Sequence, residues 1–134
     1  MIEVGCAIIY KEGKILIAQR KPGGPMGGYW EFPGGKHEPG ESLQDCLVRE
    51  VREELGVVIQ PERLIHHAVH TYPERTLKLY FVLCRFLSGR PLKLDCYDFR
   101  WIKPAELRNF RFPPADDEVI GDLIRNQFEY FGRG

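Results

Sequence analysis

The stretch Gly35–Val57, GKHEPGESLQDCLVREVREELGV, predicts a loop that leads into an amphipathic helix. Four apolar residues recur every fourth position and form one stripe of that helix, namely Leu43, Leu47, Val51 and Leu55. Ser42 suits the N-cap and Gly56 suits a left-handed position just past the last turn. The stretch is therefore expected to place one helix face against a core.

Three glutamates of this helix share a patch beside the apolar stripe. Glu50, Glu53 and Glu54 stand at positions i, i+3 and i+4. Like charges at this spacing repel by roughly a few tenths of a kcal/mol per pair. A divalent cation held by oxygen ligands would relieve the repulsion. The alternative is a solvated charged face on which Arg49 and Arg52 pair with the acids.

The spacing of the whole stretch favours the cation. It completes the pattern G-x5-E-x7-R-E-U-x-E-E-x-G-U, where U is aliphatic, from Gly35 through Glu41 and Arg49 to Val57. The chain thereby resembles the Nudix hydrolases. The resemblance implies a loop–helix–loop that binds Mg²⁺, or Mn²⁺ as a substitute, and hydrolyses a diphosphate bond linked to a nucleoside or a similar group.

Length and composition limit the class of protein. A chain of 134 residues with 43% hydrophobic content is expected to form one domain, residues 1–134. The formal net charge of +0 predicts no long-range attraction to nucleic acid or to an anionic membrane. No apolar run reaches the ~18 residues that span a bilayer. The four cysteines lack zinc-type spacing, which favours reduced thiols and the cytoplasm. We expect a monomer or a weak homodimer.

The remaining patterns predict a mixed sheet between two main helices. Strands are expected at 3–10, 14–20, 29–32, 57–60, 64–71, 76–87 and 99–102. Residues 61–63 are expected to form a turn. The apolar face of the last helix is expected to contain Val119, Ile120, Leu123, Ile124 and Phe128. This is an α/β (α+β) architecture, and the resemblance implies the same α/β/α sandwich.

Outside the helix the chain resembles the MutT-type branch, which cleaves nucleoside triphosphates to monophosphate and pyrophosphate. The stretches that carry this resemblance are 30–36, 72–75, 89–91 and 112–116. The metal ligands that it implies are the Gly34 carbonyl, Glu50, Glu53, Glu54 and Asp95. Asp98 is the alternative to Asp95, because the family usually has a glutamate at the matching position.

Catalytic roles are also assigned from the resemblance and from the chemistry of phosphoryl transfer. Glu53 or Glu50 is expected to take the proton of the attacking water. Arg49 is expected to orient these glutamates, and Glu41 to support the loop or a second ion. Glu54 is expected to act mainly as a ligand.

Substrate contacts are expected from residues on both sides of the glycines. Arg20 matches a family position that contacts phosphates, although it could be a surface arginine at a strand end. Gly34, Gly35 and Lys36 are expected beside the substrate. Phe32 either stacks on the base or packs in the core. Residues 21–28 either cover the substrate or merely connect two strands. Further pocket candidates are His70, Tyr72 and Tyr80.

Asp116 decides which base is read. In the MutT branch the matching residue is an asparagine, which both donates and accepts hydrogen bonds. A protonated Asp116, sharing a proton with Asp117, would suit 8-oxoguanine in the same way. An ionised Asp116 would accept from the amine of cytosine. The structural alternative is that Asp116 caps the last helix.

Three functional hypotheses follow. The first is a Mg²⁺-dependent (deoxy)nucleoside triphosphate pyrophosphohydrolase that removes oxidised nucleotides such as 8-oxo-dGTP. The second is hydrolysis of CTP, dCTP or 5-substituted pyrimidine triphosphates. The third, from another class, is a nucleotide-binding Nudix module without catalysis, and the intact set of glutamates disfavours it.

Overall fold

The amino-terminal hairpin forms where Glu12 and Gly13 adopt positive φ angles of 50° and 78°, which turn the chain back sharply. The computed structural model of the protein describes residues 1–132. Its strands are β1 (Ile2–Lys11), β2 (Lys14–Gln19), β3 (Trp30–Glu31), β4 (Gly34–Lys36), β5 (Val58–Thr71), β6 (Thr76–Ser88) and β7 (Asp98–Ile102). Its helices are α1 (Leu43–Leu55), α2 (Asp117–Arg125) and α3 (Gln127–Phe131), with the 3-10 helices η1 (Pro104–Asn109) and η2 (Pro114–Asp116).

A mixed sheet forms the centre of the fold. The strand order is β3-β2-β1-β6-β5, with β4 paired to β1 and β7 paired to β2. Strands β1 and β6 run parallel from Ile2↔Leu77 to Tyr10↔Arg85, and the other pairs are antiparallel. The predicted mixed sheet is therefore confirmed.

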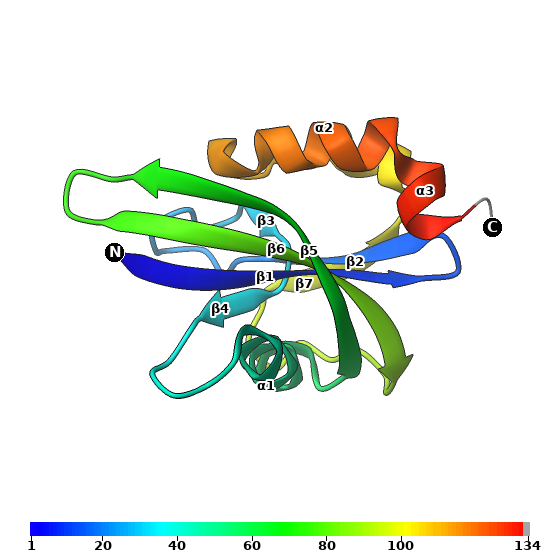
Figure 1. Ribbon diagram of the computed structural model, residues 1–134, viewed down its shortest axis with the longest axis horizontal. Helices are drawn as coiled ribbons and strands as arrows, with labels where there is room; N and C mark the ends of the chain where they lie inside the picture. Colours follow the sequence, from blue (N-terminus) through cyan, green and yellow to red (C-terminus); the bar gives the residue numbers. More distant parts are fainter. Residues whose placement is uncertain (133–134) are drawn as a thin grey trace.

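Helices cover both faces of this sheet, with α1 below it and α2 and α3 above it in Figure 1. Successive residues of β1 point to opposite faces, so Ile8 packs in the α2 layer and Ile9 in the α1 layer. On α1 the predicted stripe is confirmed, because Leu47, Val51 and Leu55 are fully buried. The α/β/α sandwich predicted from the sequence is the observed architecture.

Both predicted ends of α1 are also observed. The Ser42 hydroxyl accepts a hydrogen bond from the Asp45 amide at 3.0 Å. Gly56 adopts φ 70°, and its N–H donates to the Arg52 carbonyl at 2.9 Å. The local capping chemistry thus fixes the length of the helix that carries the glutamates.

Two expectations about the elements were wrong. Residues 61–63 form no turn, because β5 is one continuous edge strand with register shifts near Pro61 and Leu64. An edge strand tolerates proline because a bulge removes the need for its missing amide. Phe128 lies outside the buried face and is 55% exposed, since the last helix breaks at Asn126 and α3 does not continue the phase of α2.

Within residues 1–132, no helix is both long and apolar enough to cross a lipid bilayer.

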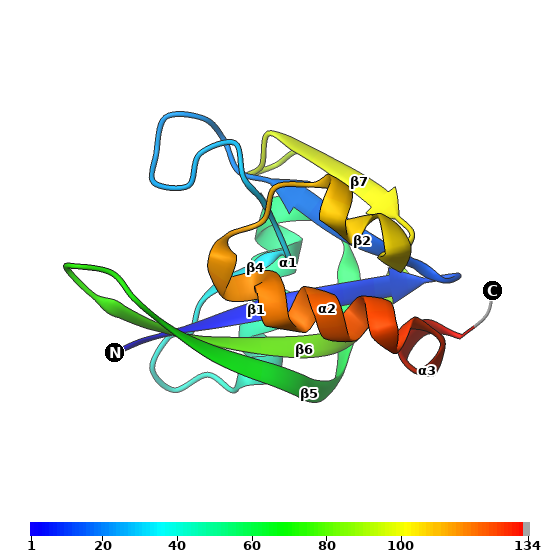
Figure 2. The ribbon, with the colours of Figure 1, turned by 90° about the horizontal axis from the view of Figure 1, so that it is seen from above.

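Two connections extend from the same end of the sandwich. Figure 2 shows the β2–β3 loop and the β5–β6 hairpin tip on that side, with the amino-terminal end of α2 between them. Both ends of the β2–β3 loop are tied together, since Arg20 and Tyr29 are joined by a 2.8 Å backbone hydrogen bond. The fold therefore frames an opening at this end.

Shortening Leu47 to alanine is expected to lower the free energy of unfolding by about 2–5 kcal/mol, because the side chain is fully buried between α1 and the sheet. Leu64→Ala is the matched control, since Leu64 is 50% exposed, and it should change stability by about 0.5 kcal/mol or less. Urea unfolding of both variants measures the difference. Equal losses would contradict the assignment of α1 to the core.

Candidate active site

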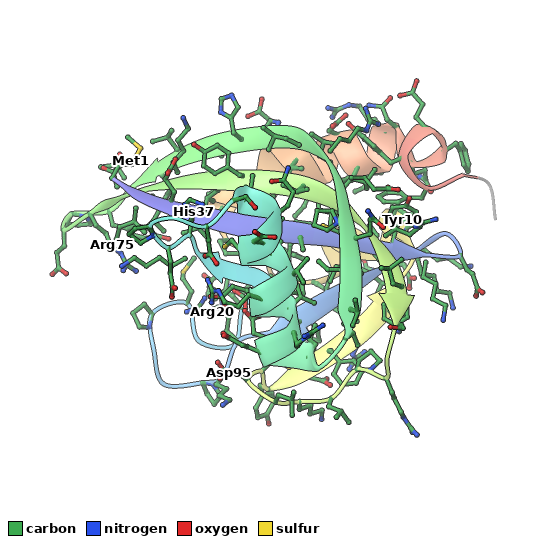
Figure 3. All side chains as sticks on the ribbon, turned by 60° about the horizontal axis from the view of Figure 1, so that its bottom comes forward. Met1, Tyr10, Arg20, His37, Arg75 and Asp95 are labelled. Carbon is green, nitrogen blue, oxygen red and sulfur yellow. The ribbon has the colours of Figure 1, made fainter. Side chains whose placement is uncertain are left out.

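A cavity of about 990 Å³ opens at the framed end of the sandwich. Its walls come from β1, β4, the end of α1, the β2–β3 loop, the β5–β6 hairpin and η2. Its charged lining residues are Arg20, Lys21, Glu31, Lys36, Glu54, Glu74, Arg75, Asp95 and Asp116. Figure 3 shows Arg20 and Asp95 on one side of α1 and Arg75 at the hairpin tip.

Gly34 and Gly35 bring the sheet and the helix into direct contact at this cavity. A Cβ atom on Gly34 would overlap the carbonyl oxygen of Gly5 on β1. A Cβ atom on Gly35 would overlap the carboxyl group of Glu50 on α1. Position 34 therefore requires glycine for β4 to pair with β1, and a side chain at position 35 would displace the carboxyl group of Glu50.

Arg49 organises the acids around α1. Its Nε and Nη2 atoms donate to the two carboxylate oxygens of Glu41 at 3.0 and 2.7 Å. Its Nη1 donates to Glu50 at 2.8 Å and lies 3.5 Å from Glu53. Its Nη2 also reaches the Lys36 carbonyl at 3.3 Å. Arg49 thus joins the loop before α1 to the glutamates of α1.

Glu41 supports this arrangement from the loop. Its carboxylate also accepts a hydrogen bond from the Glu38 amide at 3.0 Å. Hydrogen bonds from Arg49, and then from that amide, lower the pKa of Glu41 to about 2. The geometry therefore matches the first of its two expected roles, support of the loop.

Glu54 is the buried carboxyl group of the site, with 8% of its surface exposed. Burial, followed by the negative charges of Glu31 and Glu50, raises the pKa of Glu54 to about 10. Glu53, by contrast, has a side chain that is 59% exposed. Glu54 and Glu53, neighbours in the sequence, therefore differ sharply in their exposure to solvent.

The structure places Asp95 and Asp98 in different surroundings. Asp95 lines the cavity, and its backbone amide donates to the Glu54 carbonyl at 3.0 Å. Its carboxylate pairs with Lys21 at 3.0 Å. The Asp98 carboxylate instead accepts from the Phe99 amide and lies near Lys93 and Arg100. The geometry favours Asp95 as the loop carboxylate of the site.

Glu31 is a charged lining residue to which the sequence analysis gave no role. Its carboxylate pairs with the Arg20 guanidinium at 3.1 Å, so both line the same wall of the cavity. Burial raises the pKa of Glu31, although the nearby charge of Arg20 opposes the shift. The available signal was an acid inside the short apolar stretch that precedes the glycines.

Asp116 faces the cavity. It occupies the N-cap position of α2, but its side chain makes no capping hydrogen bond. Only 6% of its surface is exposed, and it lines the cavity. Burial, and then the charge of Glu31, raises the pKa of Asp116 to about 7. The helix-capping alternative for its side chain is therefore wrong.

The other pocket candidates divide into two groups. Phe32 packs in the core on Phe112, with ring centroids 5.0 Å apart, and because it also lines the cavity its stacking on a base stays a prediction. His70 and Tyr72 line the cavity as well. Tyr80 does not belong to this lining, because its hydroxyl donates to Glu3 at 2.6 Å on the sheet surface.

The donor set fits a hard divalent cation in its chemistry. The Gly34 carbonyl, the glutamates of α1 and Asp95 supply only oxygen atoms, which Mg²⁺ and Mn²⁺ prefer. Among residues 1–132, no three acidic, histidine or cysteine side chains are grouped closely enough to hold an ion. Arg49 holds Glu50, and Lys21 holds Asp95, so these acids are paired with cations of the chain itself.

Comparison with known proteins identifies the family. Residues 4–122 match the family described as NUDIX domain. The CTP pyrophosphohydrolase of Escherichia coli strain K12 is 37% identical over 120 residues, which cover 90% of this chain and 89% of that protein. The 8-oxo-dGTP diphosphatase of the same strain is 33% identical over 125 residues, which cover 92% and 97%.

The solved structures agree with this result. The solution structure of the E. coli ORF135 protein superposes with a TM-score of 0.81 at 33% identity, covering 95% of this chain and 91% of that chain. The chain therefore belongs to the Nudix hydrolase family. The resemblance to the MutT-type branch is confirmed by its relatives and structural neighbours.

Arg49→Lys is expected to reduce kcat by roughly 10–100-fold, because a lysine cannot keep the paired hydrogen bonds to Glu41 while also holding Glu50. Arg52→Lys is the matched control, since Arg52 is an exposed arginine on the same helix. Steady-state kinetics of both variants give the comparison. A kcat of Arg49→Lys equal to that of the wild type would show that Arg49 does not organise the acids.

Proposed function

We propose that the protein is a Mg²⁺-dependent nucleoside triphosphate pyrophosphohydrolase that acts on oxidised nucleotides such as 8-oxo-dGTP. The observation that carries this proposal is the position of the buried carboxyl of Glu54 in the wall of a 990 Å³ cavity, beside Gly34 and Gly35. Relatives that act on 8-oxo-dGTP and CTP support the substrate class.

The proposed metal ligands are the Gly34 carbonyl, Glu50, Glu53, Glu54 and Asp95. A divalent ion bound there would neutralise phosphate oxygens and lower the pKa of a bound water. Mg²⁺ is the proposed physiological ion, and Mn²⁺ offers the same preference for oxygen.

The chain's own residues would do the rest of the work. Arg20, at the mouth of the cavity, binds phosphate oxygens, and Lys36 adds a second positive charge. Glu53 takes the proton of the attacking water, because its contact with Arg49 is longer than that of Glu50, 3.5 Å against 2.8 Å. Arg49 keeps both glutamates oriented.

The base is proposed to lie between Phe32 and Asp116. Phe32 offers an aromatic surface, and Asp116 offers a carboxyl group whose pKa is about 7. A protonated carboxyl both donates and accepts, which matches the O6 acceptor and the N7–H donor of 8-oxoguanine. An ionised carboxylate only accepts, which matches the amine of cytosine. Asp116 therefore also supports CTP as a second candidate substrate, in line with the CTP-hydrolysing relative.

We also propose that residues 1–134 act as one domain in the cytoplasm. All four cysteines are free thiols, as expected for a reducing compartment.

Pyrophosphate release across a panel of oxidised, purine and pyrimidine triphosphates tests the activity. We expect turnover in Mg²⁺, loss of that turnover in EDTA, and a decrease of roughly 100-fold or more in Glu53→Gln, which removes the proposed base. Glu129→Gln is the control, because Glu129 is an exposed glutamate on α3. Wild-type turnover no greater than that of Glu53→Gln on every triphosphate would reject the proposal.

The ratio of kcat/KM for 8-oxo-dGTP to kcat/KM for CTP is expected to fall as the pH rises through about 7. The reason is that Asp116 loses its proton, and with it the ability to donate, in this range. In Asp116→Asn, the amide donates at every pH, so the ratio should be higher and nearly flat. A wild-type ratio independent of pH between 6 and 8 would exclude Asp116 as the base-reading group.

A further inference from the structure

Lys21 connects two loops across the mouth of the cavity. It lies two residues after β2, and its ammonium group is 3.0 Å from the Asp95 carboxylate. Asp95 belongs to the loop between β6 and β7, which is fixed to the end of α1 by the hydrogen bond from the Asp95 amide to the Glu54 carbonyl. Figure 3 shows the β2–β3 loop passing beside Asp95.

The pair is a poor candidate for a stabilising contact. The two side chains are 59% and 70% exposed, and ion pairs this exposed contribute only about 0–1 kcal/mol. Lys21 also lines the cavity next to Arg20, where positive charge favours bound phosphate. The pair therefore places a cation of the chain on the carboxylate proposed to bind a metal.

On α1, too, a side-chain cation of the protein contacts a proposed metal ligand, since Arg49 lies 2.8 Å from Glu50. Arg49, however, is anchored by four acceptors and is only 28% exposed. Lys21, by contrast, donates to a single carboxylate oxygen of Asp95 from the end of a flexible four-carbon stem. Lys21 is consequently the cation that can leave its carboxylate with little cost.

We propose that Lys21 competes with the divalent cation for Asp95 and, once displaced, binds the phosphate groups of the nucleotide. The inference rests on the proposed role of Asp95 as a metal ligand. An ion held by Asp95 would bring any phosphate group bound to it close to the Lys21 ammonium, so the required movement would be small.

The test uses Lys21→Met, with Lys93→Met as the matched control. Lys93 is similarly exposed, at 56%, and also pairs with an aspartate, Asp98 at the start of β7, at 3.6 Å. Mn²⁺ affinity is measured without nucleotide by calorimetry. The affinity for inorganic pyrophosphate is then measured in saturating Mg²⁺.

Lys21→Met is expected to bind Mn²⁺ roughly two- to fivefold more tightly, the range set by an exposed ion pair, because the competitor is gone. It should bind pyrophosphate more weakly, by roughly threefold or more, because a phosphate contact is gone. Lys93→Met should change neither value. Opposite changes in the two affinities distinguish this role from a merely structural one.

Asp95→Asn separates failure of this inference from failure of the metal assignment. If Asp95→Asn weakens Mn²⁺ binding while Lys21→Met leaves it unchanged, the competition is overturned and the ligand role of Asp95 stands. If Asp95→Asn has no effect, both the ligand role and the competition are rejected. Unchanged pyrophosphate affinity in Lys21→Met would reject the phosphate contact, whatever the activity panel shows.

Discussion

Repulsion among carboxyl groups that the fold forces together is the constraint around which the site is built. The chain relieves it in three ways. Arg49 pairs with Glu50, Lys21 pairs with Asp95, and burial raises the pKa of Glu54, which favours its uncharged form. Each of these effects reduces the repulsion locally. Each also leaves carboxyl oxygens in the site, and these are the ligands that a hard divalent cation prefers. The protein thus compensates the negative charge of these acids while keeping their side chains in the site.

The carboxyl groups cannot spread apart, because the backbone that carries them is held by the core and by close packing. Leu47, Val51 and Leu55 fix α1 on the sheet. Gly34 lets β4 lie against the backbone of β1, and Gly35 leaves space for the carboxyl group of Glu50 from α1. Apolar burial therefore supplies the free energy that keeps the charged groups near one another.

The parts of the structure that depend on local chemistry were predictable from the sequence. The stripe of α1, the Ser42 cap and the Gly56 end follow from spacing and from residue types. The parts that depend on tertiary neighbours were not predictable. The bulges that keep β5 continuous through Pro61 require an edge position in the sheet. Tyr80 lies outside the cavity lining because its hydroxyl donates a hydrogen bond to Glu3 on the neighbouring strand β1. Glu31 belongs to this second group, since its burial depends on walls contributed by distant segments.

Glu31 also links the two ends of the cavity. Its negative charge raises the pKa of Glu54 at the proposed metal end and the pKa of Asp116 at the proposed base end. Arg20, its ion-pair partner, is the proposed phosphate contact. Arg20 lowers the pKa of Glu31 and thereby favours its charged form, against the effect of burial. Base reading and cation binding therefore share one electrostatic environment, and a change at either end is expected to alter the proton affinity at the other.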